Sequence, residues 1–113
     1  NGYWQSELYF RNIRKELLQE FIPKNKLSQK NEEVLSRIKT VNSVSIHFRR
    51  GDYLSNANAA KFHGVMSLDY YLNAVQIINS KLVNPEFFVF SDEPEWVKEN
   101  FKLDFPVHYI DFN

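Results

Sequence analysis

Hydrophobic residues recur at helical spacing in the first part of the chain. Between Trp4 and Phe21 the apolar residues form one stripe and the charged residues lie largely opposite, which predicts an amphipathic helix. Pro23 ends it, and Ser28 is a suitable N-cap for a second helix that runs to about Lys39. The side chains expected to face inward are Phe10, Ile13, Leu17, Leu18 and Phe21 in the first helix and Val34, Leu35 and Ile38 in the second. The chain is therefore predicted to open with two helices.

Beyond these helices the hydrophobic period changes to two. Val44, Ile46 and Phe48 alternate with polar side chains, which predicts a strand. Phe87-Phe88-Val89-Phe90 is a short, wholly apolar run, the pattern of a strand that is covered on both faces. Val107 to Ile110, which follows a proline, is predicted as a third strand.

Two further helices are predicted between these strands. Ser67 is the expected start of the first, whose apolar stripe is Leu68, Tyr71, Leu72, Val75, Ile78 and Leu82. Ser91-Asp92 ends the second strand, and Asp92 with Glu95 resembles a capping box for the next helix, with Pro94 near its first turn. The order of elements is therefore β-α-β-α-β.

This order predicts an α/β fold, a Rossmann-like half with a parallel sheet and right-handed crossovers. We expect residues 1–113 to be a single fragment, with a helical lead-in at residues 1–40 and an α/β half at residues 43–113. Ligands of such sheets bind beyond the carboxyl ends of the strands. The polar groups that fall at those ends are His47 to Arg50 with Asp52, then Ser91 and Asp92, then Asp111.

Composition narrows the function classes. The formal net charge of the 113 residues is zero, without the basic excess that general nucleic-acid or anionic-membrane binders usually show. The absence of cysteine excludes disulfides and thiolate metal sites. No apolar run approaches the roughly 20 residues of a membrane helix, and the first residues do not form a signal peptide. Because the chain does not begin with Met, we expect a piece of a longer protein. The cysteine-free composition, rich in Asn, Lys and Phe, favours a bacterial source, and we expect the protein to be cytoplasmic and associated with a membrane at most peripherally.

The end of the first predicted strand carries the candidate chemistry. His47-Phe48-Arg49-Arg50-Gly51-Asp52-Tyr53 places two guanidiniums, an imidazole and a carboxylate within seven residues. A guanidinium binds phosphate oxygens in bidentate fashion and keeps its charge at any working pH. On an extended chain Arg49 points to the same side as His47, and Arg50 to the other. One arginine can therefore face a ligand while its neighbour pairs with a carboxylate such as Asp52.

Adjacent arginines are also common on protein surfaces, where solvated ion pairs contribute little stability. The position at the carboxyl end of a parallel strand favours an anion site over that alternative. Lys61 and His63 in the following loop would add to the local positive field.

These residues carry a resemblance to a known family. His47-x-Arg49-Arg50-x-Asp52-Tyr53 resembles the HxRRxDY motif of the α-1,2-fucosyltransferases of glycosyltransferase family 11. The segments Gly2-Tyr3-Trp4-Gln5-Ser6-Glu7-x-Tyr9-Phe10 and Phe87-Phe88-Val89-Phe90-Ser91-Asp92-x-Pro94-Glu95-Trp96-Val97 are similar to those that precede and follow it in the family. The three matches occur in the right order and cover almost the whole chain.

The resemblance implies a GT-B-type inverting transferase that moves fucose from GDP-fucose to the 2-hydroxyl of a galactose-terminated glycan, with no cofactor and no obligatory metal. It also implies that the α/β half at residues 43–113 binds the nucleotide sugar. Arg49 would be the catalytic residue and contact the β-phosphate, while Arg50 would support it or pair with an acid. The implied donor-binding residues are His47, Arg49, Arg50, Asp52, Tyr53 and Asp92. For Asp92 a role as helix cap is the alternative, and for the general base Glu7, Asp52 and Asp92 stay open.

Two other interpretations are compatible with the residues. One is another GDP-fucose-dependent enzyme, α-1,6- or protein O-fucosyltransferase, although the segment from Gly2 to Glu7 favours the α-1,2 family. The other is a non-catalytic nucleotide-binding module. We further expect the fragment alone to be inactive and to self-associate through an exposed sheet edge.

Overall fold

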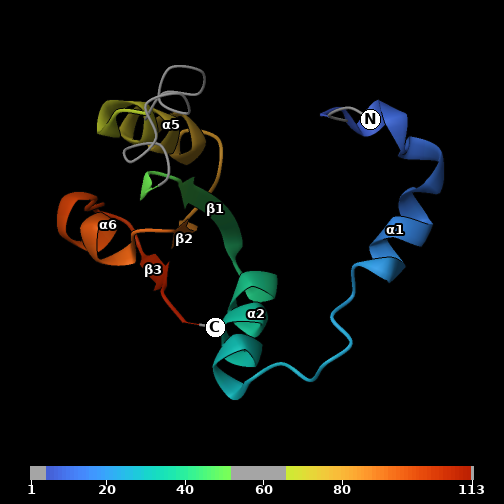
Figure 1. Ribbon diagram of the computed structural model, residues 1–113. Helices are drawn as coiled ribbons and strands as arrows, with labels where there is room; N and C mark the ends of the chain where they lie inside the picture. The colour runs from blue at the N-terminus through green and yellow to red at the C-terminus, as the bar shows by residue number, and fades with distance from the viewer. Residues whose placement is uncertain (1–4, 52–65, 113) are drawn as a thin grey trace. The chain divides into compact units, whose positions relative to one another are not determined.

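The computed structural model describes residues 5–51 and 66–112 and divides into two compact units, Asn1–Glu32 and Glu33–Asn113 (Figure 1). The first unit contains two 3₁₀ turns, η1 (Glu7–Tyr9) and η2 (Arg11–Ile13), and the helix α1 (Arg14–Glu20). The second contains a three-stranded sheet and its helices. Helix α2 (Gln29–Thr40) runs across the division between them.

The continuous helix predicted from Trp4 to Phe21 is wrong. Its described part consists of the two 3₁₀ turns and a seven-residue α-helix, and the backbone leaves the helical region at Phe10 (φ −132°, ψ 16°) and Ile13 (φ −112°, ψ 21°). No side chain of these elements is buried, and Phe21 is 80% exposed. Because helical stability in proteins comes mostly from burial of the apolar face, a stripe that is not buried adds little to hold a long helix.

The second predicted helix is confirmed as α2. The hydroxyl of Ser28 accepts a hydrogen bond from the Asn31 backbone N–H at 3.3 Å, so the predicted cap is in place. Its inward face is less buried than predicted, since Val34 and Ile38 are half-buried and Leu35 is 38% exposed.

The sheet confirms the predicted α/β fold. Its strands are β1 (Asn42–Phe48), β2 (Pro85–Ser91) and β3 (Val107–Ile110), all parallel and ordered β1-β2-β3. The central strand β2 is buried through Pro85 to Val89, as its unbroken apolar run predicts. The three strands therefore end at one edge, in the arrangement of a Rossmann-like half.

Helices α5 (Leu68–Asn79) and α6 (Pro94–Asn100) lie on the same side of this sheet (Figure 1). Together they form the core, whose buried members are Ile46, Phe48, Val75, Phe87, Val89, Val97 and Phe101. The predicted stripe of α5 is correct for Leu68, Tyr71, Val75 and Ile78 but wrong for Leu72 and Leu82, which are 38% and 39% exposed. Leu72 lies at the margin of the stripe, and the helix ends before Leu82.

A buried carboxylate links α2 to the opposite face of the sheet. Glu86 on β2 is only 8% exposed, and Arg37 on α2 donates to it from Nε at 3.0 Å and from a second nitrogen. The ring of His108 on β3 lies 2.9 Å from the same carboxylate and stacks on Phe88 of β2. These contacts satisfy a charge that would otherwise be costly to bury.

None of the helices within residues 5–51 and 66–112 is long and apolar enough to cross a membrane.

Two positions of α5 are expected to differ sharply in their effect on stability. Val75 is 2% exposed and Ile77, two residues later, is 56% exposed. We expect Val75→Ala to lower the free energy of unfolding by about 1.5–3 kcal/mol, because it removes buried methyl groups and leaves a cavity. Ile77→Ala should change it by no more than about 0.5 kcal/mol. Urea unfolding followed by circular dichroism measures both, and equal losses would contradict the assignment of the buried face.

The buried carboxylate predicts a pH dependence of stability. The hydrogen bond from Arg37, and then that from His108, holds the pKa of Glu86 below its ordinary value of 4.5. A lowered pKa means that the stabilisation is present above this ordinary value and is lost as pH falls through the lower folded pKa. Glu86→Gln should therefore be less stable than the original chain at neutral pH, and the difference should shrink below about pH 4.5.

Thermal unfolding at a series of pH values measures this difference, with the exposed Glu99→Gln as the control of equal chemistry. A gap between Glu86→Gln and the original chain that stays constant into acid would show that the carboxylate charge does not carry the effect.

Candidate functional site

The carboxyl ends of the three strands bring the predicted polar groups to one edge of the sheet. Phe48 at the end of β1 pairs with Ser91 on β2, and Phe90 pairs with Ile110 on β3. The residues that follow these ends are Arg49 and Arg50, Asp92 and Glu93, and Asp111. The predicted convergence is confirmed for these residues, whereas Asp52, which was predicted with them, lies outside the described residues.

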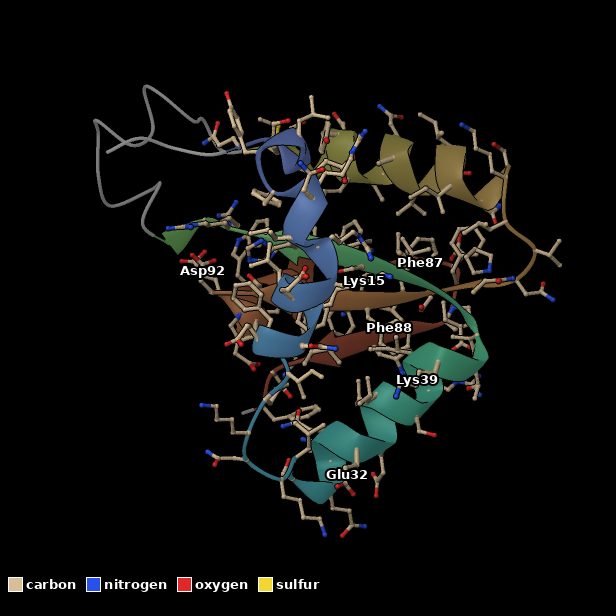
Figure 2. The ribbon with its side chains drawn as sticks, turned by 90° about the vertical axis from the view of Figure 1, so that its right-hand side faces the viewer. Lys15, Glu32, Lys39, Phe87, Phe88 and Asp92 are labelled. Carbon is tan, nitrogen blue, oxygen red and sulfur yellow. The ribbon has the colours of Figure 1, made fainter. Side chains whose placement is uncertain are left out.

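Asp92 holds the backbone that follows β1. Its Oδ1 accepts a hydrogen bond from the Arg50 N–H and its Oδ2 accepts one from the Gly51 N–H, each at 3.0 Å. Figure 2 shows Asp92 beyond the end of the sheet, beside the point where β1 stops. A Cβ on Gly51 would lie 3.3 Å from Oδ2 of Asp92, tighter than ordinary contact. The absence of a side chain at Gly51 therefore leaves room for the Asp92 carboxylate.

The capping box predicted for Asp92 and Glu95 is wrong. The N-cap of α6 is Glu93, and no side chain caps it by hydrogen bonding. The Ser91 hydroxyl instead accepts from the Glu93 N–H at 2.9 Å, and Glu95 accepts from Lys98 at 2.8 Å. Both oxygens of Asp92 face the end of β1, so they are engaged across the sheet edge.

The side chain of Arg50 is held against α6. Its Nε donates to Oε2 of Glu93 at 3.2 Å, and its guanidinium lies 3.3 Å from the centroid of the Trp96 ring. Only 18% of this side chain is exposed, so the cation–π contact is partly shielded from water. Asp52, the carboxylate that the sequence suggested as partner, lies outside the described residues, as do Tyr53, Lys61 and His63.

Arg49 and His47 are exposed at the same edge. Strand alternation places their side chains on the opposite side from Arg50. The backbone below them is fixed by Tyr71 of α5, whose hydroxyl donates to the His47 carbonyl oxygen at 3.3 Å and whose ring stacks on Phe48 at 3.9 Å. Burial raises the pKa of the Tyr71 hydroxyl above its ordinary value of 10.0, so it stays a hydrogen-bond donor at neutral pH.

An ion pair between Lys98 and Asp111 lies at the end of β3. Lys98 on α6 donates to Asp111 at 2.6 Å and to Glu95 at 2.8 Å, and these bonds raise the pKa of its ammonium group. Asp111 is therefore partly neutralised by a cation on the helix that precedes its strand. This contact joins β3 to α6 at the same edge as the arginines.

A cavity of about 360 Å³ lies between β1 and α5. It begins near His47 and Tyr70 at the carboxyl end and runs along Val44 and Ile46 of β1 to Ile78 and Phe87. Most of its lining is apolar, with the aromatic rings of two adjacent tyrosines at one end. In the part of the chain that the structure describes, no three His, Asp or Glu side chains gather closely enough to hold a metal ion.

Glu93 and Trp96 are the site residues that sequence reasoning missed. The signal was present, because Glu93 follows Asp92 at the end of β2 and Trp96 lies one helical turn further on. Their partner, Arg50, could not be identified from the sequence, since it lies more than forty residues earlier in the chain.

Comparison with known proteins gives relatives of one kind. The chain is 41% identical over 98 residues to an alpha-1,2-colitosyltransferase from Escherichia coli, covering 87% of this chain and 33% of the relative. It is 41% identical over 69 residues to an O-antigen biosynthesis glycosyltransferase from the same species, covering 61% of this chain and 22% of that protein. The chain is also 31% identical over 108 residues to a galactoside alpha-(1,2)-fucosyltransferase 1 from Leontopithecus chrysomelas. This match covers 88% of this chain and 29% of the relative.

The chain thus spans a third or less of the length of these curated relatives. No solved structure matches it significantly. The sequence profile of glycosyl transferase family 11 matches all of residues 1–113. With this match over its whole length, and with relatives that are glycosyltransferases by name, the chain belongs to glycosyl transferase family 11.

Proposed function

We propose that the protein to which this chain belongs is an inverting α-1,2-fucosyltransferase that moves L-fucose from GDP-fucose to the 2-hydroxyl of a galactoside. Family membership and the name of the primate relative support the reaction class. The observation that carries the proposal is the arginine pair beyond β1. Arg50 is held by Glu93 and Trp96, while Arg49 is exposed at the edge where ligands of parallel sheets bind.

In this proposal Arg49 stabilises the departing diphosphate. The bond between the anomeric carbon of fucose and a β-phosphate oxygen breaks, and its electron pair goes to that oxygen. The acceptor oxygen bonds to the anomeric carbon from the opposite face and gives up its proton to a base. Negative charge on the diphosphate grows during this step, so a fixed guanidinium is worth more in the transition state than in the ground state.

Catalysis without a metal or other cofactor is part of the proposal. A divalent ion would neutralise the same phosphate oxygens, and in this proposal the exposed guanidinium of Arg49 supplies that charge instead. We propose His47, on the strand face shared with Arg49, as a further contact to the nucleotide. Asp52 and Tyr53 are proposed as donor contacts because of the sequence resemblance. Mutation of Glu7, Asp52 and Asp92, the three candidates, would identify the general base.

The sugar carried by the donor has a second candidate. The Escherichia coli relative with 41% identity is named a colitosyltransferase, and its name gives the same 1,2 linkage as that of the fucosyltransferase. Nucleotide-activated colitose is therefore the alternative donor. The names of these relatives give no support to α-1,6- or protein O-fucosyl transfer or to a module without chemistry.

The remaining partner is a galactose-terminated glycan, and we propose that the reaction takes place in the bacterial cytoplasm. A bacterial relative named for O-antigen biosynthesis is consistent with a surface-glycan acceptor.

Arg49→Lys tests the proposed role of Arg49 in stabilising the departing diphosphate. Lysine keeps the charge but loses the planar fork, so we expect turnover of GDP-fucose by the complete polypeptide to fall by about a hundredfold or more. Steady-state kinetics with a galactoside acceptor measures the change. Arg14→Lys on the exposed helix α1 is the matched control and should leave turnover within about twofold. Near-normal turnover of the Arg49 variant would show that the role is misassigned.

The 113-residue chain alone is expected to give no sustained fucosyl transfer. A GT-B-type reaction takes place between two domains, and this chain offers one nucleotide-binding half, in which Arg49 is exposed rather than enclosed in a cleft. Incubating the purified chain with GDP-fucose and a galactoside, followed by mass spectrometry of the acceptor, measures product. Continuous turnover would mean that these residues are a complete minimal enzyme.

The same preparation reports on self-association. The outer edge of β1 has no strand partner among the described residues, and β1 contains neither proline nor a charged Lys, Arg, Asp or Glu side chain that would blunt it. Size-exclusion chromatography with light scattering should therefore show species larger than 13.5 kDa as concentration rises.

A further inference from the structure

We propose that Asp92 is a positioning residue, which sets the direction of Arg49 by holding the backbone that follows it. This inference rests on the proposed function and deepens it. It differs from a ligand contact and from a cap of α6, because the two oxygens of Asp92 accept from the backbone N–H groups of Arg50 and Gly51, which follow β1.

The contact is bidentate and suited to a carboxylate. The N–H groups of Arg50 and Gly51 are consecutive donors, and each bonds a different oxygen of Asp92 at 3.0 Å. An amide side chain has only one acceptor oxygen, so it would present an N–H to one of these donors. Hydrogen bonds to an ionised acceptor are also stronger than neutral ones. The site therefore uses both the shape and the charge of Asp92.

Asp92 is itself attached to the most rigid part of the sheet. It follows β2, the central strand, whose Phe87, Phe88 and Val89 are at most 2% exposed. Glu93 and Trp96, further along the same segment, hold the Arg50 side chain. The segment from Asp92 to Trp96 thus fixes both the backbone and the side chain of Arg50.

Arg49 lies between two fixed points. On one side Tyr71 bonds the His47 carbonyl oxygen and stacks on Phe48. On the other side Asp92 bonds the N–H of Arg50, which belongs to the peptide unit that Arg49 begins. The exposed guanidinium of Arg49 therefore extends from a backbone that is anchored before and after it. A displacement of about 1 Å can cost about a hundredfold in rate, so loosening one anchor should be measurable.

The test is a double-mutant cycle in the complete polypeptide. Asp92→Asn should lower kcat/KM for GDP-fucose by about tenfold or more when Arg49 is present. In the Arg49→Lys background the same change should cost about twofold or less, because the geometry it protects is already lost. Asp104→Asn, an exposed aspartate beyond α6, is the control and should be neutral in both backgrounds. Equal losses from Asp92→Asn in both backgrounds, or none in either, would overturn the proposal.

A second measurement does not depend on the reaction. Amide hydrogen exchange of Arg50 and Gly51 should accelerate about tenfold or more in Asp92→Asn, while the Val89 amide in β2 keeps its rate. Unchanged exchange at the two turn amides would overturn the positioning role, and acceleration throughout β2 would show general destabilisation instead. If the original enzyme does not turn over GDP-fucose, the proposed function fails, and this exchange result still decides the role of Asp92.

Discussion

The burial of one strand governs this fold. β2 is paired on both sides, packs α5 and α6 against one face and carries Glu86 and Phe88 on the other. Its continuous apolar run gives it no solvated face, which is the property of strands at the centre of parallel sheets. The segment that leaves this strand carries Asp92, Glu93 and Trp96, so the most firmly placed element also supplies the groups that hold the arginines.

The two adjacent arginines differ in physical environment. Arg50 is largely shielded, with one hydrogen bond to a carboxylate and an aromatic ring beneath its plane. Arg49 is exposed on the opposite side. Guanidinium is weakly hydrated and planar, which makes it suited to both situations, whereas an ammonium group would fit the stacked position poorly. Strand alternation sends the two identical residues to opposite sides, and Glu93 and Trp96 then hold one of them, Arg50, as a structural cation.

The strands of the sheet could be predicted, because each is recognisable from the hydrophobic pattern of a short segment. The alternation through Val44, Ile46 and Phe48 and the run at Phe87–Phe90 gave the strands, and the spacing of helices between them gave parallel pairing. Patterns failed where the outcome depends on distant residues. Asp92 has the sequence context of a helix cap, but donors 41 and 42 residues earlier take its oxygens. The first helix breaks for the same kind of reason, since periodicity shows which face is apolar and not what covers it.

The separation of these partners in sequence also governs when the site can form. The turn after β1 is synthesised well before the aspartate that holds it, and the intervening chain must fold back before either hydrogen bond exists. Such non-local contacts form late, because the entropy of closing the loop is lost before any contact compensates for it. The pairing of β1 with β2 brings Asp92 and the turn together. Until β2 docks, both arginines of the nascent chain are therefore solvated, and their environments become distinct when β2 and the segment after it come to lie beside β1.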